Sequence, residues 1–205
     1  TTIELPEDLK ELNTQSFSKC TKLVSIEVPY GIKKLFANTF NGCSSLESVS
    51  IPETVTVISS YVFSGCTNLT DVEIPSAVTE ISIGAFTNCS SLETVNFLSN
   101  DEGDSCKIIR EYAFAGDKKL KNINLEKVEL VGSRAFYSCT GLVNIDLAST
   151  YAIGYEAFKD CTSLAYVDIT PLRNCGERAF ENCTSLTEIK NGLYTNFSVG
   201  MFTNS

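Results

Sequence analysis

The chain has 205 residues, 43% of them hydrophobic, which is typical of a globular chain rather than a disordered one. Its formal net charge is −9, and such a charge repels nucleic-acid phosphates and anionic membrane surfaces. We therefore expect no nucleic acid among its partners, and because no run of 18 residues is apolar we expect no membrane insertion.

Phenylalanine recurs at a fixed interval and sets the register of the chain. It stands every 23 residues at the start and, after one interval of 28, every 22 residues; the positions are Phe17, Phe40, Phe63, Phe86, Phe114, Phe136, Phe158, Phe180 and Phe202. The first four repeats follow A-F-x-x-C-x-x-L-x-x-V-x-I-P-x-x-V-x-x-I with substitutions, after a half repeat that begins near Ile3. A fixed period with leucine-type spacing predicts a solenoid of stacked repeats.

Two periodicities occur within each repeat. Apolar and polar residues alternate over Val72-Glu73-Ile74, which predicts a short strand with one buried face. The proline that follows, such as Pro75, ends that strand. Apolar residues from Phe86 to Leu92 step by three, which predicts a helical turn or short helix. Stacked repeats then bury one core and form a parallel sheet, whereas a β-helix would place strands over 86–92.

The repeat pattern breaks at 98–106, where five residues are inserted within the polar, acidic segment from Ser99 to Ser105. This composition predicts a surface loop, which is either a binding element or tolerated decoration. Asp101 and Asp104 lack the ligand spacing of a known Ca²⁺ loop. We predict a single domain over 1–205, with 23-residue repeats in 1–97, the insertion at 98–106 and 22-residue repeats in 107–205.

The repeats after the insertion are one residue shorter and lack the proline; Glu126, Ala148 and Thr170 replace it. Asp117 stands in the cysteine position of its repeat, and Cys175 takes the place of an isoleucine. The last repeat degrades at Asn191, which we interpret as the approach to a capping or linker region. Because Thr1 begins inside a repeat and no initiator Met is present, we expect the chain to be part of a longer protein.

Seven of the nine cysteines follow a repeat phenylalanine by three residues: Cys20, Cys43, Cys66, Cys89, Cys139, Cys161 and Cys183. There is no histidine and no C-x-x-C pair, so a zinc site would need thiolates from separate repeats. We predict small buried hydrophobic residues stacked in register, with no metal and no cofactor. A disulfide between stacked neighbours and a metal site are the alternatives.

The segment from Ile74-Pro75 to Leu92 reads I-P-x-x-V-x-x-I-x-x-x-A-F-x-x-C-x-x-L and resembles the BspA-type, or Treponema pallidum-type, leucine-rich repeat. The resemblance covers almost the whole chain over about eight repeats. It implies a right-handed α/β leucine-rich-repeat solenoid with a short parallel sheet on the concave face and helical turns and loops on the convex side. It also implies a secreted or cell-surface protein that adheres to host matrix or cell-surface proteins.

Residues that flank the inward Val or Ile of each strand point outward in two columns. One column is Ser25, Ser48, Asp71, Thr94, Asn122, Asn144, Tyr166 and Glu188; the other is Glu27, Ser50, Glu73, Asn96, Asn124, Asp146, Asp168 and Lys190. They form either an ordinary solvated face or a mildly acidic strip for a basic or hydroxyl-rich partner. The candidate binding residues are Asp71, Glu73, Asn96, Asn124, Asn144, Asp146, Tyr166 and Asp168, with Tyr166 as the best single anchor.

The absence of histidine removes Ser-His and Cys-His nucleophile pairs, so we expect no enzyme and name no catalytic residue. Asp71 and Glu73 have a separation near that of an inverting glycosidase pair, but any strand with acids two apart has it. The sequons at Asn88 and Asn182 are by-products of the repeat; others lie at Asn68 and Asn196. We predict a protein-binding module; a structural spacer and a carbohydrate-binding surface are the alternatives.

Overall fold

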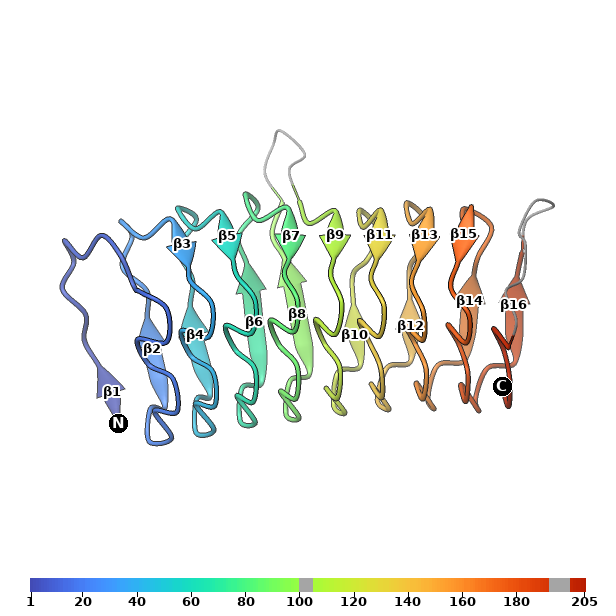
Figure 1. The fold of residues 1–205 in the computed structure, drawn as a ribbon, viewed down its shortest axis with the longest axis horizontal. Helices are drawn as coiled ribbons and strands as arrows, with labels where there is room; N and C mark the ends of the chain where they lie inside the picture. The colour runs from blue at the N-terminus through green and yellow to red at the C-terminus, as the bar shows by residue number, and fades with distance from the viewer. Residues whose placement is uncertain (100–104, 192–199) are drawn as a thin grey trace.

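The structure, a computed structural model, describes residues 1–99, 105–191 and 200–205. The chain winds into coils that stack along one long axis, and its two termini lie at opposite ends of the stack (Figure 1). Successive coils place their strands side by side in two parallel rows and close through a series of turns. The predicted solenoid with parallel strands is therefore confirmed.

The first row contains the strands that the alternating pattern predicts. They are β1 (Thr2–Ile3), β2 (Ser25–Glu27), β4 (Ser48–Ser50), β6 (Asp71–Ile74), β8 (Thr94–Phe97), β10 (Asn122–Ile123), β12 (Asn144–Ile145), β14 (Tyr166–Asp168) and β16 (Glu188–Lys190). They pair in parallel within the groups β1-β2-β4, β6-β8-β10-β12 and β14-β16. Val72 pairs with Val95 in register, and both side chains are buried while their neighbours in the strand Asp71 and Thr94 are exposed.

The second row is one seven-stranded parallel sheet that the sequence analysis did not predict. Its strands are β3 (Lys34–Leu35), β5 (Val57–Ile58), β7 (Glu80–Ile81), β9 (Ile108–Ile109), β11 (Leu130–Val131), β13 (Ala152–Ile153) and β15 (Asn174–Cys175). The inward residue of each strand is the last apolar position of the repeat pattern, such as Ile81. A strand of two residues is too short to show an alternating pattern in the sequence.

The third side of each coil is built from turns, and the predicted helical turns on the convex side are wrong. No helix occurs in the described residues, and 86–92 contains turns without a strand as well. Backbone φ is positive two residues before and two residues after every repeat phenylalanine, as at Gly84 (58°) and Asn88 (61°). An α-helix needs negative φ at successive residues, so these left-handed residues stop it.

The turns instead hydrogen-bond between coils. The backbone N–H of Phe86 donates to the carbonyl of Ala113 in the next coil at 2.8 Å, and that of Phe114 donates to the carbonyl of Ala135 at 2.8 Å. The third side is thus a ladder of turns that satisfies its backbone polar groups across the stack, as a sheet does.

The phenylalanines form a continuous stack through the core. Neighbouring ring centroids lie 5.1–5.5 Å apart, from Phe17 to Phe202, with interplanar angles of at most 15°. The rings from Phe40 to Phe180 are fully buried. Each coil contributes one ring, so the stack ties every coil to its two neighbours.

The cysteines form a second column beside the rings, and they are buried as predicted except for the half-buried Cys20. The thiol of Cys89 donates to the carbonyl of Phe63 in the preceding coil at 3.1 Å, and Cys139 makes the same bond to Phe114 at 3.0 Å. No disulfide joins any of the nine cysteines, all of which lie in described residues. Within the described ranges no group of three or more Cys, Asp or Glu is placed to hold a metal ion.

The insertion separates β8 from β9. Its central residues 100–104, including Asp101 and Asp104, lie outside the described residues, as does the sequon at Asn196. In the part of the chain that the structure describes, no helix is long and apolar enough to cross a membrane.

Candidate functional site

The outward side chains of the first row of strands form what we call the polar face. All eight predicted binding residues are placed on it or at the strand ends: β6 aligns Asp71 with Thr94 and Glu73 with Asn96 of β8, and β10 and β12 align Asn122 with Asn144. Six of the eight are exposed, whereas Tyr166 and Asp168 are half-buried. The predicted columns are therefore confirmed as structure, and their role in binding stays a prediction.

A hollow of about 410 Å³ lies on the polar face over β4, β6 and β8. It is lined by Val49, Ser50, Ile51, Asp71, Val72, Glu73, Thr94 and Asn96. Its polar lining side chains are those of Ser50, Asp71, Glu73, Thr94 and Asn96. It therefore gathers two carboxylates, two hydroxyl groups and one amide in one concave area.

The carboxylates of the hollow have no cationic partner. Among the described residues, no lysine or arginine lies within ion-pair distance of Asp71 or Glu73, whereas the neighbouring Glu93 pairs with Lys121 at 2.9 Å. The hydroxyl group of Thr70 donates to Oδ1 of Asp71 at 3.1 Å. Two adjacent negative charges without a counter-ion favour a ligand that carries positive charge or hydrogen-bond donors.

Three of the predicted binding residues also end their strands. Oδ1 of Asn124, Asp146 and Asp168 each accepts a hydrogen bond at 2.9 Å from the backbone N–H two residues further on. These Asx turns replace the proline that ends the strands of the first half. In the 22-residue repeats the residue at the proline position donates its backbone N–H to this turn, which a proline could not do. Oδ1 of each of the three side chains is therefore already hydrogen-bonded within the protein.

At the C-terminal end of the polar face, the predicted binding residue Asp168 has a cationic partner. Lys190 pairs with Asp168 at 2.9 Å, next to the half-buried Tyr166. The hydrogen bond from Thr170 and the ion pair with Lys190 lower the pKa of Asp168 to about 2. Tyr166 and Asp168 therefore offer less free surface and charge than the residues of the hollow.

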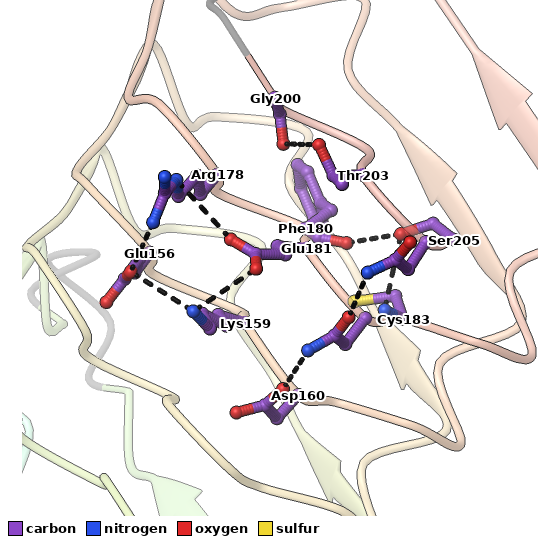
Figure 2. A network of polar contacts seen from close by, with 12 residues as sticks. Glu156, Lys159, Asp160, Arg178, Phe180, Glu181, Cys183, Gly200, Thr203 and Ser205 are labelled. Atoms are coloured by element: carbon purple, nitrogen blue, oxygen red, sulfur yellow. Dashed lines mark hydrogen bonds and ion pairs between the residues drawn. The ribbon is translucent and has the colours of Figure 1, made fainter.

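A cluster of ion pairs on the turn side was not predicted. The carboxylate of Glu156 is almost fully buried and meets Arg134 at 2.6 Å, Lys159 at 3.3 Å and Arg178 at 4.0 Å. Figure 2 shows Lys159 and Arg178 between Glu156 and Glu181, which continues the network. Burial raises the pKa of Glu156, but hydrogen bonds from Arg134, Tyr155 and Lys159 outweigh it, and the net shift is downward.

This network joins three coils, and each of its two carboxylates is paired with at least two of its three cations. It therefore stabilises the stack rather than offering free charge to a ligand. Nearby, the side-chain amide of Asn182 donates a hydrogen bond to Oδ1 of Asp160 at 2.7 Å. The signal in the sequence was weak, because the pairs that join coils lie 22 residues apart and only Glu156–Lys159 and Arg178–Glu181 are close in the chain.

The comparisons with known proteins agree with the geometry. Residues 1–103 and 101–205 match the family described as BspA type leucine rich repeat region, with six copies of the repeat. No curated protein matches the chain in sequence.

Solved structures share the fold. The leucine-rich repeat protein of T. pallidum is 21% identical with a TM-score of 0.57, over 85% of this chain and 70% of that chain. A leucine-rich repeat protein from Eubacterium ventriosum is 23% identical with a TM-score of 0.72, over 86% of this chain and 46% of its own. A leucine rich cell surface protein from Faecalibacterium prausnitzii is 23% identical with a TM-score of 0.53, over 86% of this chain and 62% of that chain.

Proposed function

Because the chain belongs to the BspA-type leucine-rich repeat family, we propose that it is a non-enzymatic protein-binding module that works at a cell surface. The binding site of this proposal is the hollow on the polar face, with Asp71 and Glu73 as its charged residues. The partner is a protein that presents lysine or arginine side chains, such as a host matrix or cell-surface protein.

The observation that carries the proposal is the pair of unneutralised carboxylates in a concave area. Glu93, which lies next to the hollow, is paired with Lys121 at 2.9 Å, whereas Asp71 and Glu73 have no lysine or arginine within ion-pair distance among the described residues. A cation that enters the hollow meets Asp71 and Glu73, while Asn96 and Thr94 supply hydrogen bonds. Charge complementarity of this kind speeds association and selects partners.

The surface location and the adhesive role rest on the family and on the relatives. One relative in structure is described as a cell surface protein. The chain spans only 46% and 62% of the length of two of these relatives, so the role of a whole protein is part of the proposal. Adhesion needs a stable, extended surface, which a stack of coils provides.

A binding assay with the purified chain tests the proposal. Immobilised host matrix and cell-surface proteins are screened, and the double variant Asp71→Asn/Glu73→Gln is compared with the unchanged chain. We expect the affinity for the bound protein to fall about tenfold. The matched control is Glu111→Gln/Glu177→Gln, which removes the same charge from the turn side.

Three outcomes contradict the proposal. Equal loss of affinity in both double variants shows that only net charge matters. Binding to a glycan array but to no protein favours the carbohydrate-binding alternative, for which Ser50, Thr94 and Asn96 supply hydroxyl and amide groups. No binding in either assay favours a structural spacer.

A further inference from the structure

The outward side of the seven-stranded sheet differs in chemistry from the polar face. We call this surface the basic face; it comprises the outward residue of each second-row strand, with the residue before and the residue after that strand. On β9, β11 and β13 the outward residues are Ile108, Leu130 and Ala152, which lie side by side in register. Tyr151, directly before β13, is 44% exposed. Ile108, Leu130 and Ala152 are half-buried, and with the exposed Tyr151 they form an apolar patch.

The patch is not required by the fold. On the polar face, the outward positions that pair across the same coils hold Thr94, Asn122 and Asn144. A parallel sheet with one solvated side needs apolar residues only on its inward side. Apolar side chains at outward positions of three adjacent strands therefore indicate a surface that another molecule covers.

The basic face as a whole is positively charged, although the chain is acidic. Lys107, Arg110 and Arg173 flank the patch, whereas Lys33 and Lys34 belong to β3, which β5 and β7 separate from β9. Over the described residues the basic face carries five cations and two anions: Lys33, Lys34, Lys107, Arg110 and Arg173 against Glu80 and Glu129. The two columns of the polar face carry the opposite balance: Glu27, Asp71, Glu73, Asp146, Asp168 and Glu188 against Lys190. The charges of the chain are thus segregated between its two rows of strands.

The anions of the basic face are already paired. Glu80 meets Arg110 at 2.7 Å and Glu129 meets Lys107 at 3.7 Å. Among the described residues, Lys33, Lys34 and Arg173 have no carboxylate within ion-pair distance. Lys34 instead lies over the ring of Phe36, 4.8 Å from its centroid, so the surplus charge next to the patch is that of Arg173, on the β15 side.

We propose that the basic face docks a segment of a partner polypeptide in which apolar residues alternate with aspartate or glutamate. Its apolar side chains cover Ile108, Leu130, Ala152 and Tyr151, and its carboxylates meet Arg173 and the other cations. Burial of the apolar side chains supplies the driving force, and the charges set the orientation. This site is separate from the hollow of the proposed function, and the two surfaces select partners of opposite charge.

Two other occupants fit the surface less well. A second copy of the chain would place either a like-charged basic face or the polar face, which lacks a matching apolar patch, against it. An anionic lipid surface would satisfy the cations but would need more of them, because each contributes only about 1 kcal/mol.

The probe is a short fluorescent peptide that alternates leucine with aspartate, and its counterpart alternates leucine with lysine. Fluorescence anisotropy with the full chain should detect binding of the acidic peptide alone, weakening as salt is added. Leu130→Gln should reduce affinity about tenfold. Arg173→Glu is a second variant that leaves the patch intact and should also reduce it about tenfold, while Asp71→Asn/Glu73→Gln should leave it unchanged or raise it.

Folding of each variant is checked by circular dichroism and thermal melting. The proposal is overturned if the two peptides bind equally, or if neither Leu130→Gln nor Arg173→Glu changes affinity. It is also overturned if the acidic peptide does not bind while vesicles containing phosphatidylserine do. Sedimentation that shows self-association of the unchanged chain, abolished by Leu130→Gln, assigns the face to a second copy instead.

Discussion

The backbone N–H of Cys89 donates a 2.7 Å hydrogen bond to Oδ1 of Asp117, which places a carboxyl group within the column of buried thiols. Asp117 is fully buried, and its Oδ2 has no hydrogen-bond partner in the described residues. Burial raises the pKa of Asp117 well above its usual value, although the bond from Cys89 opposes this. The folded state therefore favours the protonated carboxyl.

We expect replacement of Asp117 by a neutral residue of similar size to stabilise the chain at neutral pH. Asp117→Asn keeps an acceptor for the N–H of Cys89, and Asp117→Cys restores the residue of the other repeats. Each removes the cost of a buried group that ionises when the chain unfolds, so the free energy of unfolding should rise by about 1–3 kcal/mol. Urea denaturation at neutral pH measures it, with Asp117→Ala as a control that leaves the N–H of Cys89 only its 3.1 Å bond to the carbonyl of Phe86.

The same residue gives a pH dependence with a definite sign. The folded pKa of Asp117 lies above the unfolded value of about 3.9, so its favourable contribution is fully present below that value. It is lost as pH rises from there through the folded pKa, because the unfolded chain releases the proton first. The difference in stability between Asp117→Asn and the unchanged chain should grow over this window; parallel stability curves would contradict the assignment.

The repeat register and the core could be read from the sequence, because one residue from each coil recurs at a fixed interval. Phe86, Cys89 and Leu92 are all buried, as their spacing predicts. The local conformation around them could not be read in the same way. A step of three is shared by helices and by successive turns, and the left-handed residues that decide between them include Tyr61, Arg134 and other types with no preference for positive φ.

The phenylalanine stack predicts a gradient of stability effects along the chain. Phe136 is fully buried between Phe114 at 5.3 Å and Phe158 at 5.1 Å, so Phe136→Ala should cost about 3–5 kcal/mol. Phe136→Leu should cost less, because it leaves a smaller cavity. Phe17→Ala should cost less than Phe136→Ala, because Phe17 is only partly buried and stacks on one side. Chemical denaturation of the three variants tests this order; equal losses at Phe17 and Phe136 would contradict it.

Of the candidate sites, the sequence pattern predicted the polar face but not the contacts that form between coils. The outward columns of the polar face followed from strand alternation, and Asp71 and Glu73 lie where it places them. The ion pair between Arg134 and Glu156 depends on a contact between coils that no local pattern records. The Asx turns at Asn124 and Asp146 are local, between residues two apart, and the missing proline was the only sign of them in the sequence. The basic face was missed because its strands are two residues long, although Ile108 and Leu130 were visible as apolar residues beside the inward position.

The thiols should differ sharply in reactivity. Burial raises the pKa of Cys43 to about 11 and that of Cys183 to about 12, so neither forms a thiolate near neutral pH. Cys20 is half-buried, and the other eight cysteines are buried. When the native chain is treated with a thiol reagent at neutral pH, about one cysteine per chain should react quickly. In the unfolded chain all nine cysteines should react. Cys20→Ser should remove the fast phase; a fast phase that persists would show that another coil opens.

The left-handed positions allow one test in which the same chemical change has opposite effects. Ser138 has φ of 58°, and the equivalent residue in the preceding coil is Gly116 with φ of 82°. A non-glycine residue in this region costs about 1–2 kcal/mol of strain, which Ser138→Gly removes. Glycine also gives the unfolded chain more conformational freedom, which lowers stability by about 0.5–1 kcal/mol. The net free energy of unfolding should therefore stay unchanged or rise by up to about 1 kcal/mol. Ser163 is also half-exposed but has no positive φ, so Ser163→Gly should lower stability by about 0.5–1 kcal/mol. Urea denaturation of the two variants measures both signs, and Ser138→Val should be the most destabilising change of the three because a β-branched residue fits positive φ worst. A loss in Ser138→Gly as large as that in Ser163→Gly would mean that strain at the left-handed positions does not limit the stability of the turn ladder.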